Sequence, residues 1–168
     1  VETMQGAGGC IPGNPEFLTL LREKSSEYEA ILIFDEVMTS RLGANGRQGA
    51  LGIIPDMTTL GKYVGGGMTA GAFGGRADIM AHYDPRNPDH FVHHGTFNNN
   101  VISLAGGAAG LGSIYTADVA DKFTNSGEHF RQRLNALGKN LDLPFQATGY
   151  GTLMNIHFVA NKINSQRD

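Results

Sequence analysis

Several kinds of residue are scarce in this sequence. Among 168 residues it has no tryptophan and a single cysteine, Cys10. One cysteine excludes an internal disulfide framework and fits a reducing compartment, so we expect a cytoplasmic protein. Because Cys10 lies in a glycine-rich turn without a neighbouring histidine, we interpret it as an unreactive residue.

Charge is also scarce. Charged residues make up 17% of the sequence, the net charge is −3, and no large basic cluster occurs. This composition argues against nucleic acid and anionic membrane surfaces as partners. No apolar run approaches the roughly 18 residues that a membrane-spanning helix requires, so we expect no membrane segment.

Glycine, in contrast, is abundant. The 24 glycines are about twice the usual share of roughly 7%. They gather near Lys62 and at 71–75 and 106–112, which is not typical of a low-complexity linker. The 40% hydrophobic content suits one globular core. The chain opens at Val1-Glu2 without an initiator methionine or a signal peptide, and we interpret it as a piece of a longer protein.

Helical and strand-like patterns alternate along the chain. Asn14-Pro15 is typical of a helix start, and apolar residues recur at helical spacing to Tyr28. The apolar run Ala30–Phe34 is typical of a strand buried on both faces in a parallel sheet. The order indicates an α/β fold. We further expect a loop over 41–55, strands over 57–60, 68–73 and 153–159, and helices over 77–83, 101–115 and 119–138. The helix over 101–115 is rich in alanine and glycine and is expected to pack closely against other backbone.

Two polar residues follow two of these strands. Asp35 ends the run Ile31-Leu-Ile-Phe-Asp35, and Lys62 lies 27 residues later, counting from 35 to 62, before the run Gly65–Gly67. In α/β proteins, ligands bind at the carboxyl ends of strands. A lysine can bond the aldehyde of pyridoxal 5′-phosphate as a Schiff base, and an aspartate can keep its ring nitrogen protonated. The pair therefore predicts a site for this cofactor, with the glycines leaving room for its flat ring.

Each member of the pair has alternative interpretations. Asp35 alone could cap the next turn, and Lys62 alone could be a solvated charge. Glu36 raises the possibility of a metal site, but adjacent strand residues point to opposite faces, so we expect no metal. The glycines around Lys62 match neither a P-loop nor a dinucleotide-binding motif. The adjacent histidines His93 and His94 lack a third zinc ligand.

Ordered motifs around the pair resemble one family. They are Glu2-Thr-Met-Gln-Gly-Ala-Gly-Gly9, Asp35-Glu-Val-Met-Thr39, Pro55-Asp-Met-Thr-Thr-Leu-Gly-Lys62, Gly71-Ala-Phe-Gly-Gly75 and His94-Gly-Thr-Phe-Asn-Asn-Asn100. In this order they resemble the class III aminotransferases, and within them the branch that contains glutamate-1-semialdehyde 2,1-aminomutase. The resemblance extends from residue 1 to about 115, and more loosely to the end.

The resemblance implies fold type I of the pyridoxal-phosphate-dependent transferases, with a large α/β domain around a mostly parallel sheet and a small α+β domain. Residues 1–142 would form the C-terminal half of the large domain. Residues 143–168 would form the truncated start of the small C-terminal domain. The loop that cradles the cofactor phosphate, the aromatic residue that stacks on the ring, and the groups that select the substrate would lie outside this chain.

The resemblance also assigns roles to residues at the strand ends. Lys62 would be the Schiff-base lysine and Asp35 the partner of the ring nitrogen. Val37, two residues further on, would pack against one face of the ring. These residues would make up the cofactor-binding part of the site that this chain contains.

Four further residues gain expected roles in the same way. Gly95 and Thr96 would bind the cofactor phosphate, in this family usually from the neighbouring subunit. A homodimer with shared active sites is therefore expected. Glu2 and Gln5 would lie near the cofactor, with less defined roles.

Three positions depart from common patterns of the family. Met38 replaces a frequent glutamine, is typical of the aminomutase branch, and would lie near the site without bonding the cofactor. Asn98-Asn99-Asn100 replaces the Ser-Gly-Asn-Pro run of true aminomutases, and Thr3 replaces a usual proline. These departures favour an aminomutase-like transaminase over the aminomutase itself.

The expected function is transfer of an amino group between a primary amine or amino acid and a keto-acid or aldehyde acceptor. The alternative within the family is the intramolecular transfer of an aminomutase. An alternative of another class is a catalytically incomplete fragment or a non-catalytic subunit that associates through the dimer surface. As an isolated chain we expect a poor catalyst, whose sheet exposes an unpaired edge.

Overall fold

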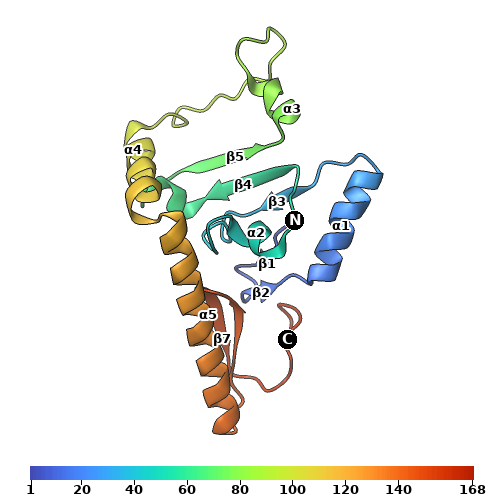
Figure 1. The fold of residues 1–168 in the computed structure, drawn as a ribbon, viewed down its shortest axis with the longest axis vertical. Helices are drawn as coiled ribbons and strands as arrows, with labels where there is room; N and C mark the ends of the chain where they lie inside the picture. The colour runs from blue at the N-terminus through green and yellow to red at the C-terminus, as the bar shows by residue number, and fades with distance from the viewer.

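The computed structural model describes residues 1–168, and a three-stranded sheet forms its centre (Figure 1). In spatial order the strands are β3 (Ile33–Asp35), β4 (Met57–Gly61) and β5 (Gly71–Gly75). β3 is parallel to β4 and pairs Asp35 with Thr59, whereas β5 is antiparallel to β4. Beyond β3, Glu2 pairs with Asp35 in a parallel bridge. The mixed α/β class predicted from the sequence is confirmed.

Two strands are displaced from their predicted positions. The strand predicted over 30–34 begins only at Ile33, because the Leu32 N–H donates to the Asp56 carboxylate (2.7 Å) and not to a neighbouring strand. The strand predicted over 68–73 begins at Gly71, because the preceding residues bond to a turn and to a helix: the Thr69 carbonyl accepts from the Ser103 hydroxyl (2.8 Å). The strand predicted over 57–60 is confirmed as β4.

The first two helices illustrate a confirmed and a wrong prediction. α1 (Pro15–Glu27) begins as predicted, because the Asn14 side chain accepts the first free N–H groups of the helix. The segment 41–55, predicted as a loop, contains α2 (Gly46–Leu51). The loop prediction is wrong because a distant carboxylate, Glu36, accepts the N–H groups at the start of α2. Such a long-range cap leaves no signal in the local sequence.

The later helices follow the prediction with changed ends. α3 (Ala77–Met80) continues into a 3-10 turn, η2 (Ala81–Tyr83). The helix predicted over 101–115 is α4 (Val101–Ala109), followed by a wider π-helical turn, η3 (Gly110–Ile114). α5 (Ala117–Asn140) is longer than predicted and extends away from the sheet (Figure 1). None of the helices combines the length and the apolar character needed to cross a membrane.

Two antiparallel hairpins complete the chain. They are β1 (Met4–Gln5) with β2 (Ile11–Pro12), and β6 (Gln146–Tyr150) with β7 (Leu153–His157). The strand predicted over 153–159 is thus confirmed up to residue 157, whereas the first hairpin was not anticipated. β6 packs along α5 and also contacts β2. The Asn135 side chain on α5 fixes this packing, since it both donates to and accepts from the backbone of Ala147.

Two small apolar clusters hold these elements together. The first, Leu18, Leu32, Phe34 and Ile53, joins α1 to the sheet. The second, Met4, Cys10 and Leu42, joins the β1–β2 hairpin to the segment after β3 and is contacted by Tyr150 and Leu153 of the second hairpin. The division of the chain at residue 142 stays a prediction.

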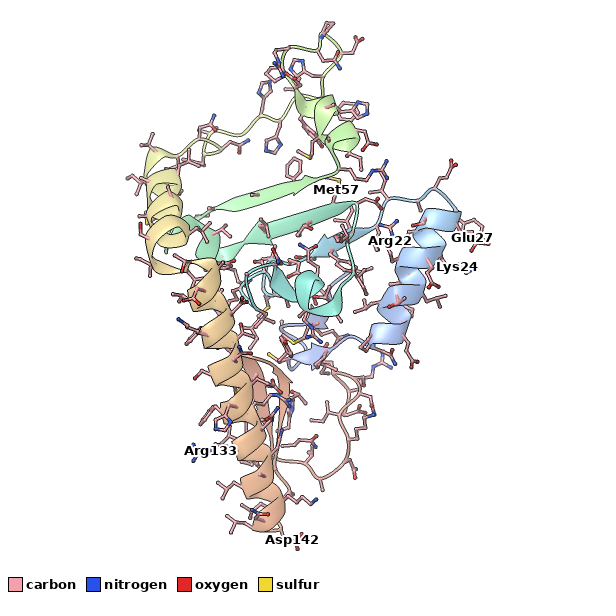
Figure 2. All side chains as sticks on the ribbon, in the orientation of Figure 1. Arg22, Lys24, Glu27, Met57, Arg133 and Asp142 are labelled. Atoms are coloured by element: carbon pink, nitrogen blue, oxygen red, sulfur yellow. The ribbon has the colours of Figure 1, made fainter.

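The carboxylate of Asp56 joins three parts of the fold. It accepts the Leu32 N–H and the guanidinium groups of Arg22 on α1 (2.9 Å) and Arg76 after β5 (3.0 Å). Figure 2 shows Arg22 on the side of α1 that faces the sheet, near Met57 at the start of β4. Burial raises the pKa of Asp56, but its hydrogen bonds to Leu32, Arg76 and Arg22 outweigh this effect and hold the pKa at about 2.

We predict that Asp56→Asn lowers the free energy of unfolding by roughly 2 kcal/mol at pH 7, because the folded state lowers the pKa of this group from 3.8 to about 2. This stabilisation is complete above the unfolded pKa and is lost as the pH falls through the folded pKa. Urea unfolding of both proteins between pH 7 and pH 3 should therefore show a difference that shrinks with acidification. An equal difference at every pH would contradict the role of the charge.

Candidate active site

Asp35 and Lys62 lie at the same edge of the sheet. Asp35 ends β3, and Lys62 directly follows β4. Because β3 and β4 are parallel neighbours, their carboxyl ends meet at one edge, as the sequence pattern predicts. Thr59 lies opposite Asp35 in the register, so Lys62 follows three residues beyond this pair, counting from 59 to 62.

The backbone of Lys62 has an unusual conformation. Its φ is +57°, in the left-handed region that residues with a side chain rarely adopt. This conformation costs about 1–3 kcal/mol and is concentrated at functional sites. Lys62 is the first residue of a 3-10 turn, η1 (Lys62–Gly65), and its side chain is exposed. The turn thus presents an exposed amine at the edge of the sheet.

The carboxylate of Asp35 has a defined orientation. Its Oδ1 accepts hydrogen bonds from the Val37 N–H (3.0 Å) and the Thr59 hydroxyl (3.1 Å). Val37 packs against the end of β4, where its Cγ1 lies 3.2 Å from the position that a Cβ on Gly61 would occupy. Glycine at position 61 therefore lets Val37 lie beside the backbone that leads into Lys62.

Glu36 points away from Asp35 into the protein interior. It accepts the N–H groups of Arg47 (3.0 Å) and Gln48 (2.6 Å) and replaces the side-chain cap that α2 lacks. Burial raises the pKa of Glu36, while these N–H groups and the Thr39 hydroxyl oppose the change. The prediction that the two adjacent acids face opposite sides is confirmed, and Glu36 has a structural role.

The three residues predicted near the site differ in how they lie relative to the end of β3. Glu2 pairs with Asp35 through the backbone, and its side chain is exposed. Met38 packs directly on Gly6, where an added Cβ would lie 1.9 Å from the methionine sulfur. Gln5 is exposed on β1 and faces the loop of its own hairpin. Glu2 and Met38 thus adjoin the segment of Asp35, and Gln5 does not.

Gly95 and Thr96 belong to an exposed segment. Every residue from 91 to 100 is exposed, and the segment connects η2 to α4 along one side of the molecule (Figure 1). The Thr96 side chain forms no hydrogen bond within the chain. Their predicted contact with the cofactor phosphate stays a prediction.

The glycines after Lys62 pack against helix α4. A Cβ on Gly66 would lie 2.1 Å from the Gly106 carbonyl oxygen, and one on Gly107 would lie 2.3 Å from the Val64 carbonyl oxygen. The predicted close approach of this helix to other backbone is confirmed. The prediction that these glycines leave room for a cofactor is wrong at Gly66, because α4 occupies that space, whereas Gly67 faces open space.

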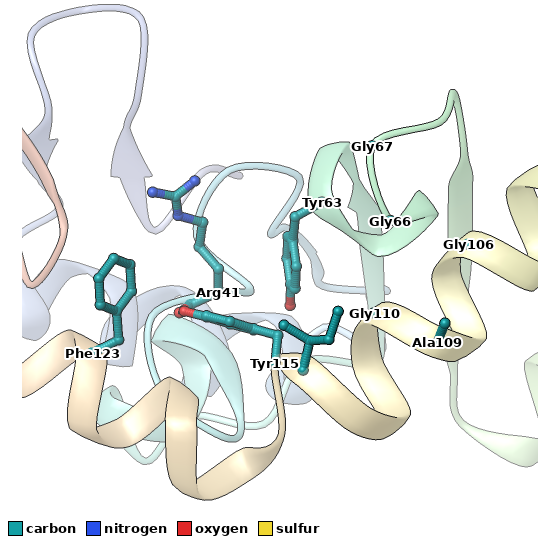
Figure 3. A pocket seen from close by; sticks show the side chains of 10 residues that line it. Arg41, Tyr63, Gly66, Gly67, Gly106, Ala109, Gly110, Tyr115 and Phe123 are labelled. Atoms are coloured by element: carbon teal, nitrogen blue, oxygen red, sulfur yellow. The ribbon is translucent and has the colours of Figure 1, made fainter.

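A cavity of about 600 Å³ lies beside the same turn (Figure 3). Tyr63, Tyr115, Ile114 and Phe123 supply its apolar walls, and Arg41 is its charged residue. The rings of Tyr63 and Tyr115 pack edge to face with centroids 5.3 Å apart. The Tyr115 hydroxyl donates to the Arg41 carbonyl (2.8 Å). Tyr115 therefore connects the segment after Asp35 with the turn after Lys62.

This arrangement of strand-end residues agrees with a comparison to known protein families. Residues 1–167 match the family model described as aminotransferase class-III. The chain belongs to the class III aminotransferase family. The family and the fold predicted from the sequence motifs are thus confirmed.

Individual relatives place the chain within this family. It is 55% identical over its whole length to a beta-phenylalanine transaminase from Variovorax paradoxus and covers 38% of that protein. The solved structure of the beta-phenylalanine aminotransferase from this organism has a TM-score of 0.95 to the chain, which covers 39% of it. A glutamate-1-semialdehyde 2,1-aminomutase from Legionella pneumophila (strain Paris) is 39% identical over 94% of this chain and 37% of its own length.

An omega-transaminase from Sphaerobacter thermophilus is a further structural relative. Its TM-score is 0.84 at 36% identity, over 95% of this chain and 36% of that one. The chain therefore spans a little over a third of the length of these relatives.

Sequence reasoning missed several contacts between distant segments. Thr59 lies within the motif Pro55–Lys62, but its bond to Asp35 was not anticipated, although the expected parallel pairing of the two strands would place it opposite Asp35. Thr3 and Thr39, whose hydroxyls lie 3.3 Å apart, come from distant segments. Arg47, whose guanidinium lies 4.1 Å from the centre of the Tyr150 ring, contacts a hairpin about a hundred residues later. Only the tertiary structure brings these partners together.

We predict that Gly107→Ala displaces η1 and lowers the free energy of unfolding by about 1–3 kcal/mol, because the new methyl group would clash with the Val64 carbonyl oxygen. Gly112→Ala is the matched control, since it lies in the adjoining turn η3 and its Cβ would meet no atom within 4 Å. Thermal unfolding of the two variants measures the difference. Equal stability of both variants would contradict the packing of α4 on η1.

Proposed function

We propose that this chain is part of an enzyme that transfers amino groups with pyridoxal 5′-phosphate. The observation that carries the proposal is the placement of Asp35 and Lys62 at the carboxyl ends of two adjacent parallel strands. The residues present fit the cofactor chemically. Lys62 offers an exposed amine to its aldehyde, Asp35 an oriented carboxylate to its ring nitrogen, and Val37 an apolar side chain to its ring.

The mechanism divides the work between these residues. When bound, the cofactor supplies an electron-withdrawing ring that stabilises negative charge on the substrate carbon bearing the amino group. Asp35, held by Thr59 and the Val37 N–H, keeps the proton on the ring nitrogen. Lys62 Nζ would hold the cofactor through its aldehyde. When free, the same amine would accept a proton from the substrate carbon and deliver it at a different atom.

We propose a β-amino acid with an aromatic group as the amino donor and a keto acid or aldehyde as the acceptor. The proposal is supported by 55% identity to the beta-phenylalanine transaminase, against 39% identity to the aminomutase. The absence of the usual aminomutase run at Asn98-Asn99-Asn100 agrees with this choice. The single cysteine supports the cytoplasm as the compartment.

Lys62→Ala should abolish the visible absorbance of a lysine-bound pyridoxal group and all amino transfer. Asp35→Asn should retain cofactor but lower kcat on the order of a hundredfold, because a neutral amide cannot keep the ring nitrogen protonated. Absorbance spectra and kcat with β-phenylalanine and a keto acid measure both effects. All variants are made in the product of the complete gene that encodes this chain. The control is Lys139→Ala, which replaces an exposed lysine on α5.

The outcomes of this experiment separate the alternatives. Absence of cofactor binding by the unmodified gene product would contradict the proposal. An aminomutase would rearrange glutamate-1-semialdehyde without an acceptor, whereas a transaminase would stop after half a turnover. Residues 1–168 expressed alone should bind and react poorly, because the chain spans 38% of its transaminase relative.

We further propose a homodimer in which Gly95 and Thr96 reach the cofactor phosphate of the neighbouring subunit. The exposed segment from 91 to 100 supports this arrangement, since the Thr96 hydroxyl has no partner within its own chain. Phe91, Val92 and Phe97 in this segment are exposed apolar residues that a second subunit would cover.

Mixing two impaired variants tests the shared site. Lys62→Ala and Thr96→Ala homodimers should each be impaired, but mixed dimers would contain one site with both native residues. After dissociation and reassociation at equal amounts, activity should rise to about a quarter of the native value, because half of the dimers are mixed and half of their sites are complete. Activity that stays at the mean of the two separate variants would place Thr96 in the same subunit's site.

A further inference from the structure

Three polar side chains lie completely buried beneath the segment that carries Asp35. Their exposed fractions are 0% for Thr3, 0% for Glu36 and 1% for Thr39. Buried polar groups are costly unless they bond to one another, and a fully bonded group of them favours one arrangement of the chain. This cluster is therefore a candidate for fixing the local geometry of the site.

The cluster consists of a pair of hydroxyl groups beside a carboxylate that caps α2. The Thr3 hydroxyl donates to the Thr39 hydroxyl (3.3 Å), and the Thr39 hydroxyl stabilises the charged form of Glu36. The Glu36 carboxylate accepts the N–H groups of Arg47 (3.0 Å) and Gln48 (2.6 Å). Since the N-cap of α2 provides no side-chain bond, Glu36 supplies this cap from a position three residues before Thr39 in the sequence.

The buried polar cluster fixes the turn that carries Asp35 and Val37, the two proposed cofactor contacts. Asp35 and Val37 flank Glu36 in sequence, and Thr39 lies two residues beyond Val37. On the other side of the backbone, Asp35 Oδ1 bonds only to the Val37 N–H and the Thr59 hydroxyl. A shift of Glu36 or Thr39 would therefore move the Asp35 carboxylate and the Val37 side chain together.

We propose that Thr3, Thr39 and Glu36 are positioning residues that set the direction of Asp35 and Val37 toward the cofactor ring. This inference rests on the proposed function. It assigns a role to the hydroxyl of Thr3, at a position where the family resemblance leads us to expect proline, which has no hydroxyl. These three residues act through Asp35 and do not themselves touch the cofactor.

Thr39→Val in the product of the complete gene tests the proposal, because it removes the hydroxyl and keeps the shape of the side chain. We expect the Kd for pyridoxal 5′-phosphate to rise about tenfold, the effect of losing one buried hydrogen bond. The pH midpoint of the absorbance of the bound cofactor should also change, because Asp35 would sit differently at the ring nitrogen. Thr39→Ser, which keeps the hydroxyl, should restore both values.

Thr124→Val is the matched control. Thr124 is a buried threonine of α5 whose hydroxyl has no hydrogen-bond partner, so the change removes no bond. It should leave the Kd and the pH midpoint at the values of the unmodified protein. A role of Thr39 in stability alone would lower the melting temperature of Thr39→Val without changing either value.

Each possible result of these measurements either supports or contradicts the positioning role. Unchanged Kd and midpoint in Thr39→Val, with cofactor binding by the unmodified protein, would overturn the positioning role and leave the proposed function intact. If the unmodified protein binds no cofactor, the proposed function itself fails, and this role with it. If Thr39→Val does not fold, Thr3→Val takes its place, because it removes the bond between the two hydroxyls, leaves Thr39 unchanged and should raise the Kd about threefold. No rise in that variant would likewise overturn the proposal.

Discussion

Hydrogen bonding between the parallel strands β3 and β4 sets the position of the whole candidate site. The pair brings two carboxyl ends to one sheet edge, and its register places Thr59 opposite Asp35. From there only Leu60 and Gly61 precede Lys62, and the small size of Gly61 lets Val37 lie against this strand end. A different register would separate the carboxylate from the lysine. The position of both side chains therefore depends on this backbone pairing.

Buried carboxylates, more than large apolar contacts, hold the segments around this sheet. The two apolar clusters contain only four and three fully buried residues. Asp56 joins α1, the entrance to β3 and the end of β5, while Glu36 joins the exit of β3 to α2. Each carboxylate accepts several hydrogen bonds, as a buried charge requires. Asp56 and Glu36 thus fix the irregular segments before and after β3.

Much of the fold could be predicted from local patterns. α1 follows from its Asn-Pro start, and α5 follows from its apolar periodicity. The family follows from motifs in a fixed order, and with it the expected roles of Lys62 and Asp35. The predictions fail where a distant partner decides the structure. Helix α2 depends on Glu36, which lies 11 and 12 residues from the N–H groups that it accepts. The delayed start of β3 depends on Asp56, which lies 24 residues from Leu32.

The sequence by itself determined the family, because its motifs occur in a fixed order, and with the family came the chemistry proposed for the lysine and the aspartate at the strand ends. It also indicated that the helix over 101–115 packs closely against other backbone, because this segment is rich in alanine and glycine. The tertiary structure alone decided what these glycines contact: the helix backbone occupies the space next to Gly66 that the sequence suggested for a cofactor. It alone decided that Thr3, Thr39 and Glu36 lie together under the site. The reason is physical, since a hydrogen bond between residues 36 positions apart leaves no trace in the local pattern of either segment.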